Sequence, residues 1–68
     1  MNLIEFSHAN IDTKVAIIPE LVFSVYYSPG HKATLIMSSG GAMVPVKEDV
    51  EQVKKQIEET TNGKRHDD

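Results

Sequence analysis

Short segments of alternating apolar and polar residues follow one another from the start of the chain to residue 46. In the first, Ile4 and Phe6 lie on one side and Glu5 on the other, which is the pattern of a half-buried strand. By the same criterion the sequence predicts strands over residues 2–6, 14–18, 20–27, 32–38 and 42–46.

Two of these predicted strands carry apolar residues on both faces. The period of two groups residues 20–27 into Leu21, Phe23, Val25 and Tyr27 on one face and Val22, Ser24 and Tyr26 on the other. It groups residues 32–38 into Ala33, Leu35 and Met37 against Thr34, Ile36 and Ser38. Because adjacent residues of a strand point to opposite faces, we expect one of the two tyrosines in the core.

Proline and glycine mark the corners between the segments. Pro19 lacks a backbone donor and predicts a strand end, and residues 29–32 predict a hairpin turn. In "SSGG", Gly40 and Gly41 are expected to supply the positive φ angles of a second hairpin turn. Pro45 fits an edge strand better than a central one.

A helical pattern follows Pro45. Its apolar stripe consists of Val46, Val50, Val53 and Ile57. Acidic residues at 48, 49 and 51 favour the N-terminal end, and helical spacing pairs Glu51 with Lys55 and Lys54 with Glu58. No residue of a preferred capping type precedes the acidic turn, so the pattern sets the helix start only to within a few residues.

A chain of 68 residues forms one domain with a small core, because it buries only about 60% of the surface that its unfolded form exposes. We expect residues 1–62 to form this domain and the polar residues 63–68 to be a flexible tail. The predicted fold class is α+β: a small antiparallel sheet or partly closed barrel of four to five strands, with one C-terminal amphipathic helix.

Composition narrows the environment of the protein. The chain has no cysteine, so disulfides and thiolate metal sites are excluded. Neither a signal peptide nor the roughly 20 apolar residues of a membrane span is present, so we expect a cytoplasmic protein with no membrane contact. Seven Lys and Arg against ten Asp and Glu give a net charge of −3, which argues against nonspecific binding of nucleic acid.

The apolar residues on the second face of the sheet need a cover, because one helix covers only one face. Val22, Tyr26 and Ile36 are predicted to lie on that uncovered face. Either the sheet curls into a barrel around them or a second copy packs there, and the second answer suits a chain that is short of core. The sequence therefore predicts a homo-oligomer with these three residues at its interface.

The order of elements resembles the FlbD-like family of small flagellar and swarming-motility proteins of bacteria. The resemblance runs through "NLIEF", "VAIIPELVFSV" and "ATLIMSSGGAMVPVKEDVEQVKKQI". The matching residues are Thr34, Ser39, Gly40, Val46, Glu48, Val50, Val53 and Ile57. Ile18 stands where the family usually has Asn, and Pro45 interrupts the strand before the helix. The resemblance implies this fold and a regulatory role in bacteria, phages or other mobile elements. A more distant likeness to LytTR-type DNA-binding domains implies a transcriptional regulator.

The two hairpin corners also offer groups that bind ligands. The candidate ligand-binding residues are Tyr26, His31, Lys32, Ser38, Ser39 and Gly40. Together they would supply a stacking surface, a positive charge, hydroxyls and backbone N–H groups to a small anion such as a nucleotide. The alternative is that both corners are plain hairpin turns, and "SSGG" lacks the spacing of a P-loop.

Nothing in the sequence indicates catalysis, since no Ser, His and Asp arrangement, carboxylate pair or cysteine nucleophile is present. His8, His31 and His66 are too widely spaced for a local metal site. We expect a noncatalytic homo-oligomeric binding or regulatory protein without metal or cofactor. The alternatives are a protein that sequesters a nucleotide signal and a DNA-binding regulator, and a protein partner is also open.

Overall fold

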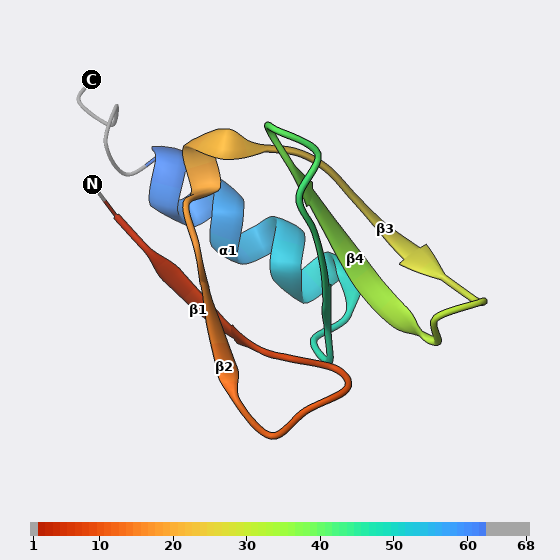
Figure 1. Cartoon of the computed structure of the whole chain (residues 1–68). Coiled ribbons are helices and arrows are strands. Elements are labelled where there is room, and N and C mark those ends of the chain that lie inside the picture. Colours follow the sequence, from red (N-terminus) through yellow and green to blue (C-terminus); the bar gives the residue numbers. More distant parts are fainter. Residues whose placement is uncertain (1, 63–68) are drawn as a thin grey trace.

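A computed structural model of the chain describes residues 2–62 and has five strands and one C-terminal helix in that range (Figure 1). The elements in chain order are β1 (Ile4–Ser7), β2 (Lys14–Ile17), a 3₁₀ turn (Pro19–Leu21), β3 (Val22–Ser28), β4 (Ala33–Ser38), β5 (Met43–Val46) and α1 (Val50–Asn62). The predicted α+β fold is confirmed, but the strands form two antiparallel sheets and do not close into a barrel. The tail predicted over residues 63–68 lies outside the described residues.

The first two strands form a hairpin in which the predicted faces are correct. Ile4 pairs with Ile17 and Phe6 with Val15. Ile4 and Phe6 are buried and Glu5 is exposed, as the alternation in the sequence predicts. Pro19 ends the second strand by starting the 3₁₀ turn that leads into β3.

The other three strands form a sheet in the order β3-β4-β5. The predicted faces of β3 are correct from Ser24 onward but wrong before it. The register shifts between Val22 and Ser24, so Phe23 is an extra residue in a β-bulge. As a result Val22 and Val25 both pack against the core, while Phe23 is 67% exposed. The expectation of one buried tyrosine is also wrong, because Tyr26 and Tyr27 are 46% and 54% exposed.

The central strand β4 is buried on both faces. Ile36 is fully buried in the core cluster, so the prediction that Val22 and Ile36 lie on the uncovered face is wrong. Leu35 points to the opposite face, where its cross-strand partners are Tyr26 and Pro45. Pro45 lies in β5 at the edge of this sheet, as predicted.

Besides the shared core, a hydrogen-bonded junction joins the two sheets. His8 forms an antiparallel bridge with Val46, and the Lys47 N–H donates to the Ser7 carbonyl at 2.8 Å. The carboxylate of Glu48 accepts from the Ser7 N–H, with both oxygens 3.1 Å from the nitrogen. These contacts hold the end of β1 against the segment that leads from β5 into α1.

The helix starts at Val50 because Asp49 caps it. The Asp49 side chain accepts a hydrogen bond of 2.8 Å from the Gln52 N–H, and its carbonyl accepts from the Val53 N–H. Val46 therefore belongs to β5 and is not part of the helical stripe as predicted. The ion pair seen in the described part of the helix joins Lys54 to Glu51 at 3.7 Å, and its exposure means that it adds little stability.

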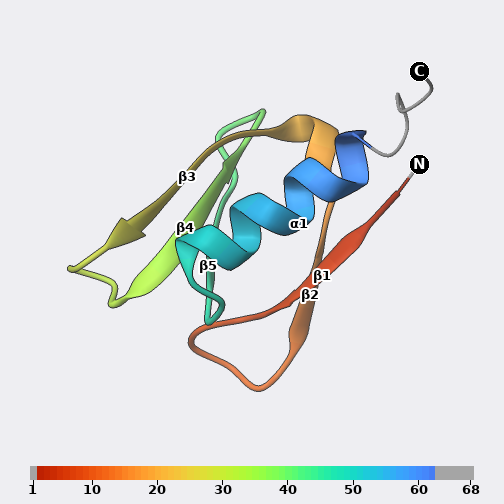
Figure 2. The same ribbon diagram turned by 180° about the vertical axis from the view of Figure 1, so that it is seen from behind.

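The core lies between α1 and the two sheets, and the helix covers only one face of the three-stranded sheet (Figure 2). Its buried members are Ile4, Phe6, Ile17, Ile36, Val46 and Val53. Val22, Val25 and Ile57 pack at its margin. Each of the five strands and the helix thus contributes at least one side chain to this cluster, as expected for a short chain with one small core.

Candidate functional site

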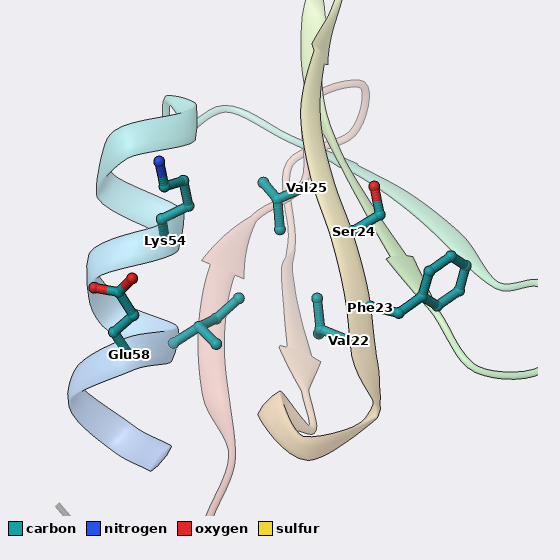
Figure 3. Close-up of a pocket in the computed structure, with 7 residues that line it drawn as sticks. Val22, Phe23, Ser24, Val25, Lys54 and Glu58 are labelled. Atoms are coloured by element: carbon teal, nitrogen blue, oxygen red, sulfur yellow. The ribbon is translucent and has the colours of Figure 1, made fainter. Parts of the chain in front are cut away.

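The face of the three-stranded sheet opposite α1 is apolar. Its central residues Ala33 and Leu35 are buried, but apolar side chains on the flanking strands β3 and β5 are exposed to solvent. We call it the open face. Its members, read from the strand register, are Ser24, Tyr26, Ser28, Ala33, Leu35, Met37, Met43 and Pro45, with the bulged Phe23 beside them. Phe23, Tyr26 and Met43 are the most exposed apolar side chains of this set. In Figure 3 Phe23 points away from α1, whereas Val22 and Val25 point toward it. The open face contains no charged residue.

The structure does not bring the predicted ligand-binding residues together. The turn over residues 29–32 lies at the start of β4 and the turn over residues 39–42 at its end (Figure 1). The six residues of β4 span about 20 Å, which separates the two turns by the length of the sheet. A single pocket lined by both corners of one chain is therefore excluded.

The first turn is held by its own contacts. The Lys32 N–H donates to the Pro29 carbonyl at 3.2 Å, and His31 Nδ1 and Ser28 Oγ share a hydrogen bond of 2.9 Å. Lys32 has a positive φ of 53°, which is uncommon for a residue other than glycine. His31 is exposed and contacts its own turn, so the hairpin explains its position.

The second turn has the predicted backbone conformation. Gly40 and Gly41 have φ angles of 86° and 84°, so both adopt the left-handed region that the sequence predicted for them. Ser39 is tied to the 3₁₀ turn, because its N–H and its hydroxyl both reach the Leu21 carbonyl, at 2.9 and 3.4 Å. Ser39 is thus explained by a structural contact, and the Ser38 N–H donates to the Ala42 carbonyl at 2.9 Å.

One hollow does combine a turn with charged side chains, and we call it the lysine pocket. It has a volume of about 250 Å³ and is lined by Ala9, Tyr27, Lys32, Ala33, Thr34, Val46, Lys47 and Asp49. Two lysines and a half-exposed tyrosine are groups that bind a negatively charged ligand with an aromatic part. The Asp49 carboxylate, also in the lining, is held by its capping bond to Gln52.

Sequence reasoning found only Lys32 of this pocket. Lys47 comes near because the preceding residue, Val46, pairs with Thr34 on β4, and Tyr27 because it pairs with Thr34 from the other side. Residues 27, 32 and 47 do not form a local sequence motif, so their spacing in the sequence does not indicate the pocket.

A second hollow of about 320 Å³ lies between β3 and α1 (Figure 3). Val22, Val25 and Ile57 form its apolar floor, and Lys54 and Glu58 stand on the helix side. It follows the free edge of β3, so any chain that approaches that edge would also contact its rim.

The described residues contain no cluster of three or more His, Asp or Glu side chains that could hold a metal ion. In the same range every buried side-chain nitrogen or oxygen has a hydrogen-bond partner. The one helix of that range is neither long nor apolar enough to cross a membrane.

Comparison with models of protein families, with curated proteins and with solved structures gives no match for this chain. The resemblance to the FlbD-like family therefore stays a prediction. The geometry of residues 2–62 supports the proposals that follow.

Proposed function

We propose that the protein is a noncatalytic binding module that acts as a homo-oligomer. The open face supports this most directly, because it exposes Phe23, Tyr26 and Met43 to water while α1 covers only the opposite face. Association that removes such a surface from water is favourable in proportion to the apolar area buried.

A second copy of this chain is the partner that best suits the open face. Each copy has a net charge of −3, but none of its charged residues lies on this face. Two copies can therefore meet here without placing like charges opposite one another. Assembly also compensates for a core that contains few fully buried side chains.

Multi-angle light scattering over a dilution series tests this proposal. We expect the mass of at least two chains at high micromolar concentration, and a dissociation constant at least tenfold weaker for Tyr26→Ser. Ile11→Ser is the matched control, because Ile11 is as exposed but lies in the loop between β1 and β2. A wild-type protein that stays monomeric throughout would rule the proposal out.

The lysine pocket supports a second candidate function, the binding of a small anion with an aromatic part, such as a nucleotide. Lys32 and Lys47 would contact the anionic group and Tyr27 would stack on the aromatic ring. This places the ligand in a different pocket from the one that the sequence predicted, with Lys32 as the shared residue.

Inorganic phosphate and adenosine monophosphate are suitable probes, measured by calorimetric titration. We expect Lys32→Ala and Lys47→Ala each to weaken the binding of the nucleotide at least tenfold, because each removes a positive charge from the pocket. Lys55→Ala on the exposed side of α1 is the control. Equal affinity in all three variants would contradict this function, and salt-dependent binding of duplex DNA would favour the DNA-binding alternative instead.

A further inference from the structure

The free edge of β3 differs from the other edges of the two sheets. It is seven residues long, VFSVYYS, and contains neither a charged residue nor a proline. Charges and prolines are the usual devices that keep an edge strand from pairing with another chain. The outer edge of β5, in contrast, has Pro45, whose carbonyl is occupied by the Ala9 N–H at 3.0 Å. β2 is only four residues long and begins with Lys14.

The hydrogen bonds within the sheet show which backbone groups of β3 are free. The Ser38 N–H donates toward β5, and the direction of the backbone N–H and C=O groups alternates from residue to residue along β4. The N–H and C=O of Ile36 therefore point toward β5, and those of Leu35 point toward β3. Leu35 pairs with Tyr26, so Tyr26 uses its N–H and C=O inside the sheet. The N–H and C=O of Val25 and Tyr27 consequently point outward at the free edge.

We propose that β3 pairs with β3 of a second copy, antiparallel and about a two-fold axis at Tyr26. Val25 of each copy then lies opposite the partner's Tyr27, and each such pair exchanges two backbone hydrogen bonds. The two copies share one six-stranded sheet, in the order β5-β4-β3 followed by its symmetry mate. This inference rests on the proposed homo-oligomer but puts the contact at the edge of β3, where Tyr26 is the open-face residue that meets the partner.

The register follows from what lies at each end of the strand. A shift of two residues in one direction pairs Tyr27 with the bulged Phe23, whose ladder is already irregular. A shift in the other direction pairs Val25 with Pro29, which has no N–H to donate. Only the register centred on Tyr26 pairs Val25 of each copy with the partner's Tyr27.

The side chains on the open face suit this pairing. Tyr26 meets the partner's Tyr26 on the open face at a position without direct hydrogen bonds, where Cα atoms approach to about 4.5 Å. An aromatic pair across two strands is favourable, and no like charges lie opposite because the strand has none. The strand carries no charge, and the two charges on the helix side of the neighbouring hollow, Lys54 and Glu58, have opposite signs. A strongly acidic or strongly basic peptide is therefore not favoured at this edge, and a second copy is the better occupant.

Disulfide trapping tests this register cleanly, because the chain contains no cysteine. In Tyr26→Cys the two introduced thiols lie across the axis within the separation that a disulfide spans. Phe23→Cys is the matched control on the same strand and side. In this register its two copies are six residues apart along the strand, or about 20 Å. We expect Tyr26→Cys to give at least tenfold more covalent dimer than Phe23→Cys under mild oxidation, read by non-reducing electrophoresis.

A backbone variant checks the hydrogen bonds independently of the side chains. Tyr27→Pro removes an outward N–H without disturbing the inner ladder, and Tyr27→Ala removes the same side chain but keeps the N–H. We expect the dimer dissociation constant of Tyr27→Pro to be at least tenfold weaker than that of Tyr27→Ala, with circular dichroism confirming that both fold.

Three outcomes separate this inference from the proposed function. A wild-type monomer would overturn both. A wild-type oligomer in which Tyr26→Cys traps no more dimer than Phe23→Cys would overturn the edge pairing and leave the homo-oligomer standing. Equal dissociation constants for Tyr27→Pro and Tyr27→Ala would likewise place the contact elsewhere.

Discussion

Lys32 combines backbone strain with a place in the lysine pocket. Its φ of 53° puts a long side chain in the left-handed region, which costs a residue other than glycine about 1–2 kcal/mol. Gly30, two residues earlier in the same turn, does not have a positive φ. The turn thus has a lysine at the position where glycine would relieve strain. Strain of this kind is often found where a side chain binds a ligand.

We expect Lys32→Gly to raise the free energy of unfolding by up to about 1 kcal/mol, because glycine adopts this conformation without a steric penalty. The same variant should weaken the binding of adenosine monophosphate, so stability and binding change in opposite directions. Urea denaturation and calorimetric titration measure the two effects. Lys14→Gly in β2 is the control and should lower stability. A Lys32→Gly variant no more stable than wild type would show that the turn holds no strain.

The two glycine turns at the ends of β4 play different parts in the fold. Gly40 and Gly41 both have positive φ, and an added Cβ at either position would meet no other atom within 4 Å. At Gly30 an added Cβ would make an ordinary contact of 4.0 Å with Ser28 Oγ, and the φ there is not positive. Backbone conformation alone therefore distinguishes the two turns.

We expect Gly40→Ala to lower the free energy of unfolding by about 1 kcal/mol, because alanine is strained at positive φ. Gly30→Ala should be neutral or slightly stabilising, since it reduces the conformational entropy of the unfolded chain. Thermal unfolding of the two variants side by side makes the comparison. The same loss of stability in both would mean that the space around the turns, and not φ, decides the effect.

The alternation in the sequence was a good guide to elements but not to every face. It predicted β1 correctly because Ile4, Glu5 and Phe6 belong to one regular ladder. It failed in β3 because the bulge at Phe23 resets the period, and no feature of the local sequence marks that bulge. The helix start was predicted only to within a few residues for a related reason: Val46 fits the helical spacing, which conceals Asp49 as the cap.

At the scale of the whole molecule, the link between Glu48 and Ser7 joins residues that are 41 positions apart in the chain. It lies beside the bridge between His8 and Val46, so hydrogen bonding between the two sheets is concentrated here, next to the core that both sheets share. The lysine pocket lies next to this junction, because Ala9 and Lys47 line the pocket and also take part in the hydrogen bonds between the sheets. Long-range contacts of this kind leave no periodic signal, which is why the sequence predicted the elements but not this pocket.

We expect Glu48→Ala to accelerate hydrogen exchange at the Ser7 amide at least tenfold, because the variant removes its two acceptor oxygens. Glu48→Gln keeps one acceptor and should have a smaller effect. Glu58→Ala, on the exposed side of α1, should leave Ser7 unchanged. Amide exchange followed by nuclear magnetic resonance gives the rates. An unchanged Ser7 rate in Glu48→Ala would show that another contact protects the junction.

The position of Val46 and Val53 in the core has a consequence for folding during synthesis. Phe6 and Ile36 leave the ribosome before the residues that cover them, since synthesis proceeds from the N-terminus. The two hairpins can form early because their contacts are local, but neither buries its apolar face alone. The nascent chain therefore exposes an unfinished core and the uncharged β3 edge together until α1 emerges. That interval is when a chaperone or a neighbouring nascent copy has access to both.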